Sequence, residues 1–200
     1  MNLSELEGCT AVLGGSFDPI HAGHLHIAHQ VLLLTKAASV LFVPSGNHHF
    51  KADKIRLNYT TRFRLVELAI ASEPRFAISR ADETGSGYTS YLMQKLFSEN
   101  PYTRFIFIIG ADNLAKLEKW HDFPWLAANL HFLILPRPGF SVQEIKLEGI
   151  IATELPIAMS AISSTEIRER IDRGDSINGM VPETLEKEIV RLYNRQQGKA

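Results

Sequence analysis

The amino-acid sequence predicts one α/β domain over residues 1–200, built as a Rossmann-like, doubly wound parallel sheet. Three observations lead to this fold class. Short apolar runs alternate with segments whose apolar residues recur every three or four positions, as strands and helices do when they alternate. The run at residues 39–43 is almost continuously apolar, which is typical of a parallel strand covered on both faces. The chain is long enough to bury a full core, and its 45% hydrophobic residues are ordinary for a globular protein.

The first part of the chain opens with a β-α-β unit. Residues 10–13 form a short apolar strand, and residues 23–36 carry enough apolar positions for a largely buried helix. Residues 39–43 are the second strand. Residues 60–72 repeat the helical pattern, and residues 76–79 form a short third strand. Such a unit is the building block of a doubly wound sheet, in which ligands bind at the carboxyl ends of the strands.

The second part continues the alternation. A Gly-Ser-Gly turn precedes a helix at residues 89–98, and the sequence RFIFII at residues 104–109 is the clearest buried strand. Residues 130–135 form the next strand, and residues 155–158 are predicted as the last one. Two helices end the chain, at residues 164–173 and 182–194.

The segment GGSFDPIHAGHL, residues 14–25, joins the first strand to the first helix. Its glycines allow a tight turn that brings backbone N–H groups close to a ligand. His21 and His24 flank the start of the helix, where unpaired N–H groups and the macrodipole attract phosphate. Two imidazoles there supply directed donors for the charge on phosphate oxygens in a transition state. The segment therefore predicts a phosphate-handling loop, with backbone contacts from Gly14, Gly15, Ser16 and Phe17 and with His21 and His24 as catalytic residues.

The segment ISSTEIR, residues 162–168, is a second candidate for binding an anion. Ser163 and Glu166 have the spacing of a capping box, which places a helix start here. Ser164 and Thr165 then lie in the first turn, and Arg168 shares a helix face with Ser164. A guanidinium beside a helix start suits bidentate phosphate binding. An ordinary capped helix with a solvated arginine has the same pattern, so the residues alone leave both interpretations open.

The two segments together resemble the nucleotidylyltransferases with an (H/T)-x-G-H motif, and most of all the nicotinate-mononucleotide adenylyltransferase family. GGSFDPIHAGHL is similar to the family signature, and ISSTEIR is similar to the family's ISSTxIR motif near the C-terminus. The resemblance implies transfer of the adenylyl group of ATP to nicotinate mononucleotide. It also implies that the helices from about residue 164 complete the phosphate site, where Ser164, Thr165 and the catalytic Arg168 grip the ATP phosphates. Mg²⁺ is expected to travel with ATP as the cofactor.

The resemblance extends to residues around the two nucleotides. The sequence IIGAD after the strand at residues 104–109 matches a family motif, which implies ATP contacts from Gly110 and Asp112. Without the family, Asp112 is equally well explained as the cap of a following helix. Trp120 matches a tryptophan that stacks on the pyridine ring. The resemblance implies a pyridine-nucleotide site made of Lys51, Arg62, Tyr88, Thr89, Trp120 and Arg137.

Two segments depart from the family pattern. The family usually has Thr-x-Asp-Thr-Leu where this chain has Thr-Ser-Tyr-Leu-Met, so Tyr91 and Leu92 replace an acid and a hydroxyl. The family tends to have Pro-Pro-His-Lys where this chain has His48-His49-Phe50-Lys51, which leaves Lys51 offset by one position from a strict match. These departures leave adenylyl transfer intact and bear only on nicotinate as the substrate ring.

The composition excludes some classes of binding partner and predicts the cellular compartment. A net charge of −1 gives no bulk attraction to nucleic acid or to an anionic membrane. The single cysteine, Cys9, excludes an internal disulfide and fits a reducing compartment. The first eight residues lack an apolar signal core, and no apolar run approaches the roughly 18 residues of a membrane helix. The cytoplasm is therefore expected, and the oligomeric state is not predicted.

Other classes of function compete with this interpretation. His48-His49 and His121-Asp122 invite a metal-dependent phosphohydrolase of the HD type, but those proteins are helical bundles, whereas this chain has several strand-like runs. A nucleotide-binding sensor without catalysis would be expected to lose His21, His24 or Arg168. No Ser-His-Asp or Cys-His set indicates a covalent step, and no resident metal site is predicted. Within the enzymes, the alternatives are adenylyl or cytidylyl transfer to another phosphate, such as nicotinamide mononucleotide or phosphopantetheine.

Overall fold

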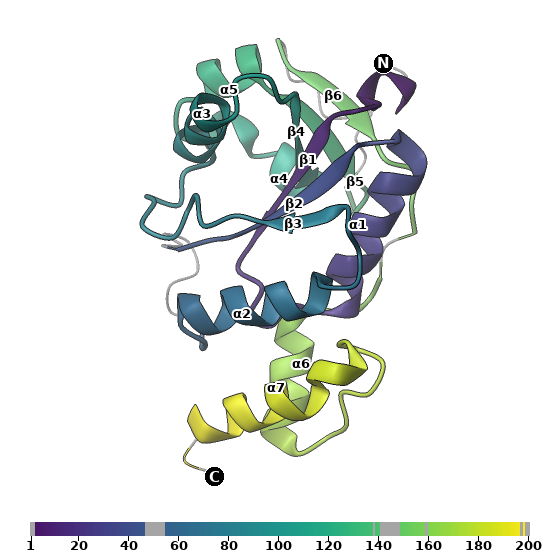
Figure 1. The fold of residues 1–200 in the computed structure, drawn as a ribbon, viewed down its shortest axis with the longest axis vertical. Coiled ribbons are helices and arrows are strands. Elements are labelled where there is room, and N and C mark those ends of the chain that lie inside the picture. The colour runs from purple at the N-terminus through teal and green to yellow at the C-terminus, as the bar shows by residue number, and fades with distance from the viewer. Residues whose placement is uncertain are drawn as a thin grey trace.

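The fold is built on a six-stranded parallel sheet with the strand order β3-β2-β1-β4-β5-β6 (Figure 1). The computed structural model describes residues 3–46, 55–137, 139–140, 149–158, 160–196 and 198. The strands are β1 (Thr10–Gly15), β2 (Ser39–Pro44), β3 (Phe76–Ile78), β4 (Phe105–Gly110), β5 (His131–Leu135) and β6 (Ile151–Glu154). This order and direction confirm the predicted Rossmann-like, doubly wound sheet.

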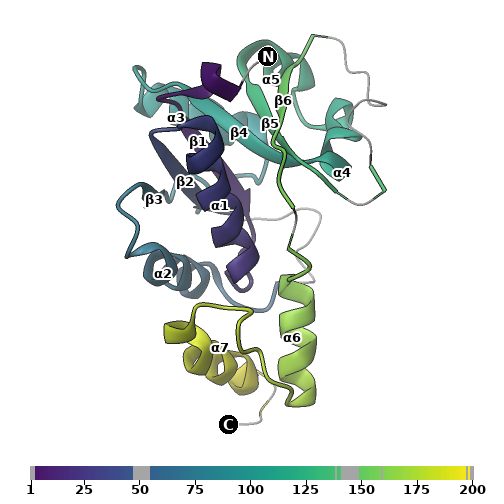
Figure 2. The same cartoon turned by 90° about the vertical axis from the view of Figure 1, so that its right-hand side faces the viewer.

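Helices connect the strands and end the chain. They are α1 (Ala22–Thr35), α2 (Tyr59–Ile70), α3 (Thr89–Glu99), α4 (Ala111–Leu114), α5 (Phe123–Asn129), α6 (Ser164–Arg173) and α7 (Glu183–Gln196). Two short 3-10 helices, η1 (Leu3–Leu6) and η3 (Leu117–Lys119), complete the described elements. None of the helices in the described part of the chain has the length and apolarity needed to cross a membrane. Helices α6 and α7 lie together beyond one end of the sheet, next to α2 and the start of α1 (Figure 2).

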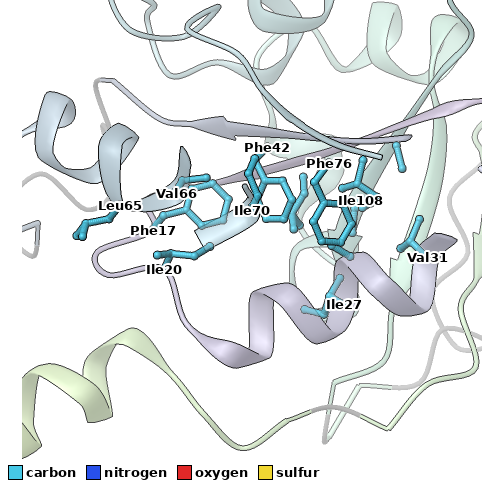
Figure 3. Packing of buried hydrophobic residues seen from close by; sticks show 14 of the residues in the cluster. Phe17, Ile20, Ile27, Val31, Phe42, Leu65, Val66, Ile70, Phe76 and Ile108 are labelled. Atoms are coloured by element: carbon cyan, nitrogen blue, oxygen red, sulfur yellow. The ribbon is translucent and has the colours of Figure 1, made fainter. Parts of the chain in front are cut away.

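The sheet is buried on both faces because successive residues of a strand point to opposite sides. On one face, alternate residues such as Leu13, Phe42 and Ile108 pack against α1 and α2 (Figure 3). On the other face, residues such as Val12 and Phe107 pack against α3 and α5. The near-continuous apolar runs seen in the sequence are therefore explained by two separate core clusters.

The sheet opens between β1 and β4, at the carboxyl ends of these strands. The ladder between β1 and β2 continues to the pair Gly15–Pro44, whereas the ladder between β1 and β4 stops at the pair Val12–Phe107. The strand order also reverses direction between β1 and β4. In doubly wound sheets this switch point is where ligands bind. Gly14 and Gly15, which were predicted to form a turn, are instead the last residues of β1, and they lie there together with Gly110, the last residue of β4.

The predicted elements are confirmed within two residues at each end, with one exception. The last strand is Ile151–Glu154, and the prediction of a strand at residues 155–158 is wrong. Leu155 donates its backbone N–H to Ile134 O at 2.8 Å, but Pro156 has no N–H group with which to extend the ladder. Helices α4 and α5 were not predicted, because four and seven residues are too few to show a helical period.

Asp18, in the loop between β1 and α1, connects the N-terminal half of the chain to the C-terminal helices. Its carboxylate is 1% exposed and accepts hydrogen bonds from Arg56 N at 2.8 Å, Leu57 N at 3.0 Å and the Tyr193 hydroxyl at 2.7 Å. The Arg168 guanidinium lies 3.8 Å from the same carboxylate. Burial, and then the Asp18 charge, raises the pKa of Tyr193, so this hydroxyl stays protonated and donates. The buried charge is thus fully solvated by protein groups.

We expect Tyr193→Phe to lower the free energy of unfolding by about 1–3 kcal/mol, because it removes a donor from a buried carboxylate. Urea unfolding measures this loss. Tyr102→Phe is the matched control, since Tyr102 is 100% exposed and its replacement should change the free energy by less than about 0.5 kcal/mol. Equal stability of the two variants would contradict the central role given to Asp18.

Candidate active site

The start of α6 contacts the loop that leads from β1 into α1. The Ser164 hydroxyl at the first residue of α6 donates to Pro19 O at 2.9 Å, and Arg168 Nη1 donates to Asp18 O at 2.7 Å. Residues from the two predicted phosphate segments, more than a hundred positions apart in the chain, are therefore in direct contact. The Ser163 side chain caps α6 by accepting from Glu166 N at 3.1 Å, as its spacing predicts.

The two histidines of the first segment form a stacked pair at the start of α1. Their ring centroids are 3.7 Å apart with an interplanar angle of 28°. The backbone N–H of His21 donates to Nδ1 of His24 at 3.3 Å, so a neutral His24 carries its proton on Nε2, where it can be donated. Gly23 makes room for this pair, because a Cβ atom there would lie 3.1 Å from two ring atoms of His21.

Both imidazoles are neutral near pH 7. Burial, and then the charge of Arg137, lowers the pKa of His21 from 6.5 to about 4. Burial, followed by His21 and Arg137, also lowers the pKa of His24 well below 6.5. Among the described residues, Nδ1 of His21 is buried and has no hydrogen-bond partner. A phosphate bound beside these rings would favour their protonated forms, because an opposite charge raises the pKa of an imidazole.

Arg137 and Asp112 lie beside the histidine pair, where β4 and β5 end. Nε of Arg137 lies 3.5 Å from Oδ1 of Asp112, and this oxygen is buried without a hydrogen-bond partner in the described part of the chain. The Asp112 carboxylate can lie this close to the backbone only because residue 110 is a glycine. A Cβ atom on Gly110 would be 2.5 Å from Oδ1 of Asp112. Arg137 was predicted to bind the pyridine nucleotide, but it lies among residues predicted to bind ATP, and its charge acts on His21 and His24. The polar groups for both nucleotides thus form one cluster.

The side chains of the second segment are held by protein contacts. The Ser164 hydroxyl is bound to the first loop, and Thr165 Oγ1 accepts from Arg168 Nη2 at 3.1 Å. The Arg168 side chain is only 13% exposed. Because a guanidinium carries five N–H donors, the hydrogen bonds to Asp18 and Thr165 leave others for an anion.

Arg62 does not have the ligand-binding position that was predicted for it. It is 1% exposed, and its guanidinium donates to the carbonyl oxygens of Leu57 at 3.1 Å, Ser16 at 2.6 Å and Ser45 at 2.7 Å. The prediction of direct pyridine-nucleotide contact is therefore corrected to a structural role. Phe17 anchors the loop through its ring, which is buried in the core beside Phe42 (Figure 3). Arg62 and Phe17 together fix the backbone of the phosphate loop.

His121 connects the segment of Trp120 to the start of α3, where two other residues predicted to bind the pyridine nucleotide lie. Tyr88 and Thr89 lie at the start of α3, and Trp120 follows η3, where it packs edge-on against Phe107 with ring centroids 6.4 Å apart. The His121 ring, next in sequence to Trp120, stacks on Tyr88 with centroids 4.6 Å apart. Lys51 and the departing residues His48, His49 and Phe50 lie outside the described residues.

Two contributors to the site were missed or misinterpreted in the sequence. The sequence predicts no role for Asp18, because its partners are too distant in sequence for any local pattern to indicate them. His121 was considered as a metal ligand with Asp122, but it contacts Tyr88 and Ser90. In the described part of the chain, no three His, Cys, Asp or Glu side chains are grouped so that they could hold a metal. The parallel sheet also differs from the helical bundle that the metal-hydrolase alternative requires.

Known proteins are similar to this chain in sequence and in fold. The model of the cytidylyltransferase-like family matches residues 12–170. The chain is 34% identical over 193 residues to the "Probable nicotinate-nucleotide adenylyltransferase" of Clostridium tetani, covering 92% of this chain and 96% of that protein. It is 36% identical over 188 residues to the protein of the same name from Salinispora arenicola, covering 92% and 100%.

A solved structure adds the fold. The nicotinic acid mononucleotide adenylyltransferase of Plasmodium falciparum, complexed with NaAD, superposes with a TM-score of 0.77 at 20% identity. The match covers 96% of this chain and 98% of that one, so the fold is shared almost throughout. The sequence matches and the two converging motifs lead to the same conclusion: the chain belongs to the cytidylyltransferase-like family and, within it, to the nicotinate-nucleotide adenylyltransferases.

Proposed function

We propose that this protein transfers the adenylyl group of ATP to nicotinate mononucleotide, giving nicotinate adenine dinucleotide and pyrophosphate. The single observation that supports this most is the contact of α6, through Ser164 and Arg168, with the loop that leads directly into the histidine pair. Two nucleotides with phosphates facing each other need cationic and N–H groups at one point, and the switch point of the sheet supplies both. The relatives named above carry this activity in their names.

The reaction is a direct displacement at phosphorus. An oxygen of the 5′-phosphate of nicotinate mononucleotide attacks the α-phosphorus of ATP, and the bond to the bridging oxygen breaks as pyrophosphate leaves. The nucleophile is already an anion, so no general base and no enzyme nucleophile are required. Catalysis then consists of positioning the two phosphates and stabilising the charge that develops between them.

Each charged or polar group of the cluster has a distinct part in this proposal. Nε2–H of His24 donates to an oxygen of the α-phosphate, and His21 lies beside it as the second imidazole. Arg168 and the start of α6 hold the departing pyrophosphate, while Arg137 adds positive charge near the histidines. Asp112 accepts hydrogen bonds from sugar hydroxyls.

Magnesium enters the reaction with ATP, as part of the substrate. Mg²⁺ keeps several water ligands and is held mainly by phosphate oxygens in sites of this kind.

The pyridine ring of the second nucleotide stacks on Trp120, beside Tyr88 and Thr89. An aromatic face against an electron-poor ring is a favourable contact.

The proposed reaction is tested by measuring pyrophosphate release with ATP fixed and the acceptor varied. Nicotinate mononucleotide should give the highest kcat/KM, and mass spectrometry should identify nicotinate adenine dinucleotide as the product. Nicotinamide mononucleotide and phosphopantetheine serve as alternative acceptors, and CTP serves as the alternative donor. Preferential use of phosphopantetheine or of CTP would overturn the proposal.

His24→Ala should lower kcat by about a hundredfold or more, because it removes one preorganised donor to the reacting phosphate. His29→Ala is the matched control, since His29 lies on the same helix. Its half-exposed side chain contacts Phe76 of β3 and does not belong to the histidine pair. Steady-state kinetics with saturating nucleotides gives both values. Near-normal turnover in the His24 variant would remove it from the mechanism.

The neutral histidines also make stability depend on pH. Between pH 6.5 and about 4, the unfolded chain binds a proton at His21 that the folded protein does not bind. The contribution of neutral His21 to the free energy of unfolding is therefore fully present above pH 6.5 and is lost as the pH falls toward 4. At pH 5 this histidine should account for a loss of about 2 kcal/mol relative to pH 7. Urea unfolding of the protein and of His21→Asn at both pH values measures it, and the variant should lose correspondingly less. An equal loss in both proteins would show that His21 keeps its ordinary pKa.

A further inference from the structure

We propose that His121 is a positioning residue that ties the two sides of the pyridine-nucleotide pocket together through its hydrogen bond to Ser90. The inference rests on the proposed function and adds a specificity-determining contact to it. It concerns affinity for the pyridine nucleotide and leaves the transfer step itself to the phosphate cluster.

The imidazole of His121 is held by the first turn of α3. Nδ1 lies 2.9 Å from the hydroxyl of Ser90, and Nε2 lies 3.4 Å from the hydroxyl of Tyr91. The ring stacks on Tyr88 at an interplanar angle of 21° and lies 4.7 Å from the centroid of the Tyr91 ring. Ser90 is completely buried, so its hydroxyl depends on this hydrogen bond. Three side chains from the start of one helix, those of Tyr88, Ser90 and Tyr91, thus converge on a single imidazole from a different segment.

The position of this contact in the chain gives it a function. Ser90 directly follows Thr89, and His121 directly follows Trp120, so the hydrogen bond joins the immediate neighbours of two residues that the proposed function assigns to the pyridine pocket. Trp120 closes η3 and Asp122 begins α5 with a left-handed φ of 53°, so His121 lies in a short irregular connection between helices. Such a connection has few backbone hydrogen bonds of its own, and a side-chain contact can therefore set the position of the indole.

The contact is made by residues in which this chain departs from its family. Tyr91 stands where the family usually has an acid, and its ring and hydroxyl both contact His121. A tyrosine in place of an acid brings no carboxylate to this edge of the proposed pocket, which receives the anionic carboxylate of the pyridine ring. The contact therefore favours nicotinate through the position of Trp120 as well as through the absence of a like charge.

The experiment compares Ser90→Ala and His121→Ala with His121→Asn, whose amide can still reach the Ser90 hydroxyl. Ser98→Ala, at the exposed end of α3, is the matched control. Binding of nicotinate mononucleotide alone is followed by tryptophan fluorescence in a Trp125→Phe background, which leaves Trp120 as the reporter. Steady-state kinetics then gives kcat and the KM of each nucleotide.

Both alanine variants should raise the Kd and the KM for nicotinate mononucleotide by about tenfold, while kcat and the KM for ATP change by less than about twofold. The double alanine variant should be no weaker than either single one, because the two residues share one interaction. His121→Asn should recover most of the affinity, and Ser98→Ala should behave like the unaltered protein.

An unchanged Kd for nicotinate mononucleotide in the alanine variants would overturn the inference, and so would a parallel rise in both KM values. The absence of rescue by His121→Asn would also count against it. These results differ from failure of the proposed function, in which the unaltered protein makes no dinucleotide from ATP and nicotinate mononucleotide.

Discussion

The conformation of the phosphate loop depends on one buried carboxylate, that of Asp18. A charge in the interior is tolerated only when hydrogen-bond donors replace the water that it has lost. Here the donors come from the segment that enters α2 and from α7, and Arg168 of α6 adds a positive charge 3.8 Å away. These three parts of the chain must assemble around the loop before the charge is satisfied. The loop that carries His21 is therefore fixed by the tertiary structure and needs no contribution from a ligand.

A buried charge of opposite sign supports the same loop from its other side. The guanidinium of Arg62 is surrounded by backbone carbonyl oxygens, including that of Ser16, and burial lowers its pKa below the usual value. Neither Asp18 nor Arg62 is exposed, and both hold the backbone so that the histidine pair is presented at the opening between β1 and β4. Electrostatic catalysis requires donors that do not have to rearrange during the reaction, and these two buried groups provide that rigidity.

Periodicity alone predicts most of this fold, because long amphipathic helices and buried parallel strands have distinct patterns. The predicted position of the last strand is wrong because residues 155–158 are as apolar as a strand. Apolarity does not show that Pro156 lacks the N–H group needed for pairing. The role of Arg62 was misassigned because a matching residue type does not tell whether its side chain faces a ligand or the backbone. His121 was considered as a metal ligand because the His-Asp pair is visible in the sequence, whereas its contact with Ser90 is a product of folding.

Tyr193 has a consequence for the order in which the protein acquires activity. Chains are synthesised from the N-terminus, and the central strands and their helices are made well before α7. Asp18 emerges early, but its hydroxyl donor is added only 175 positions later. A nascent chain on the ribosome can therefore form its sheet while its nucleotide loop still lacks this hydrogen bond, which is made only after α7 has been synthesised.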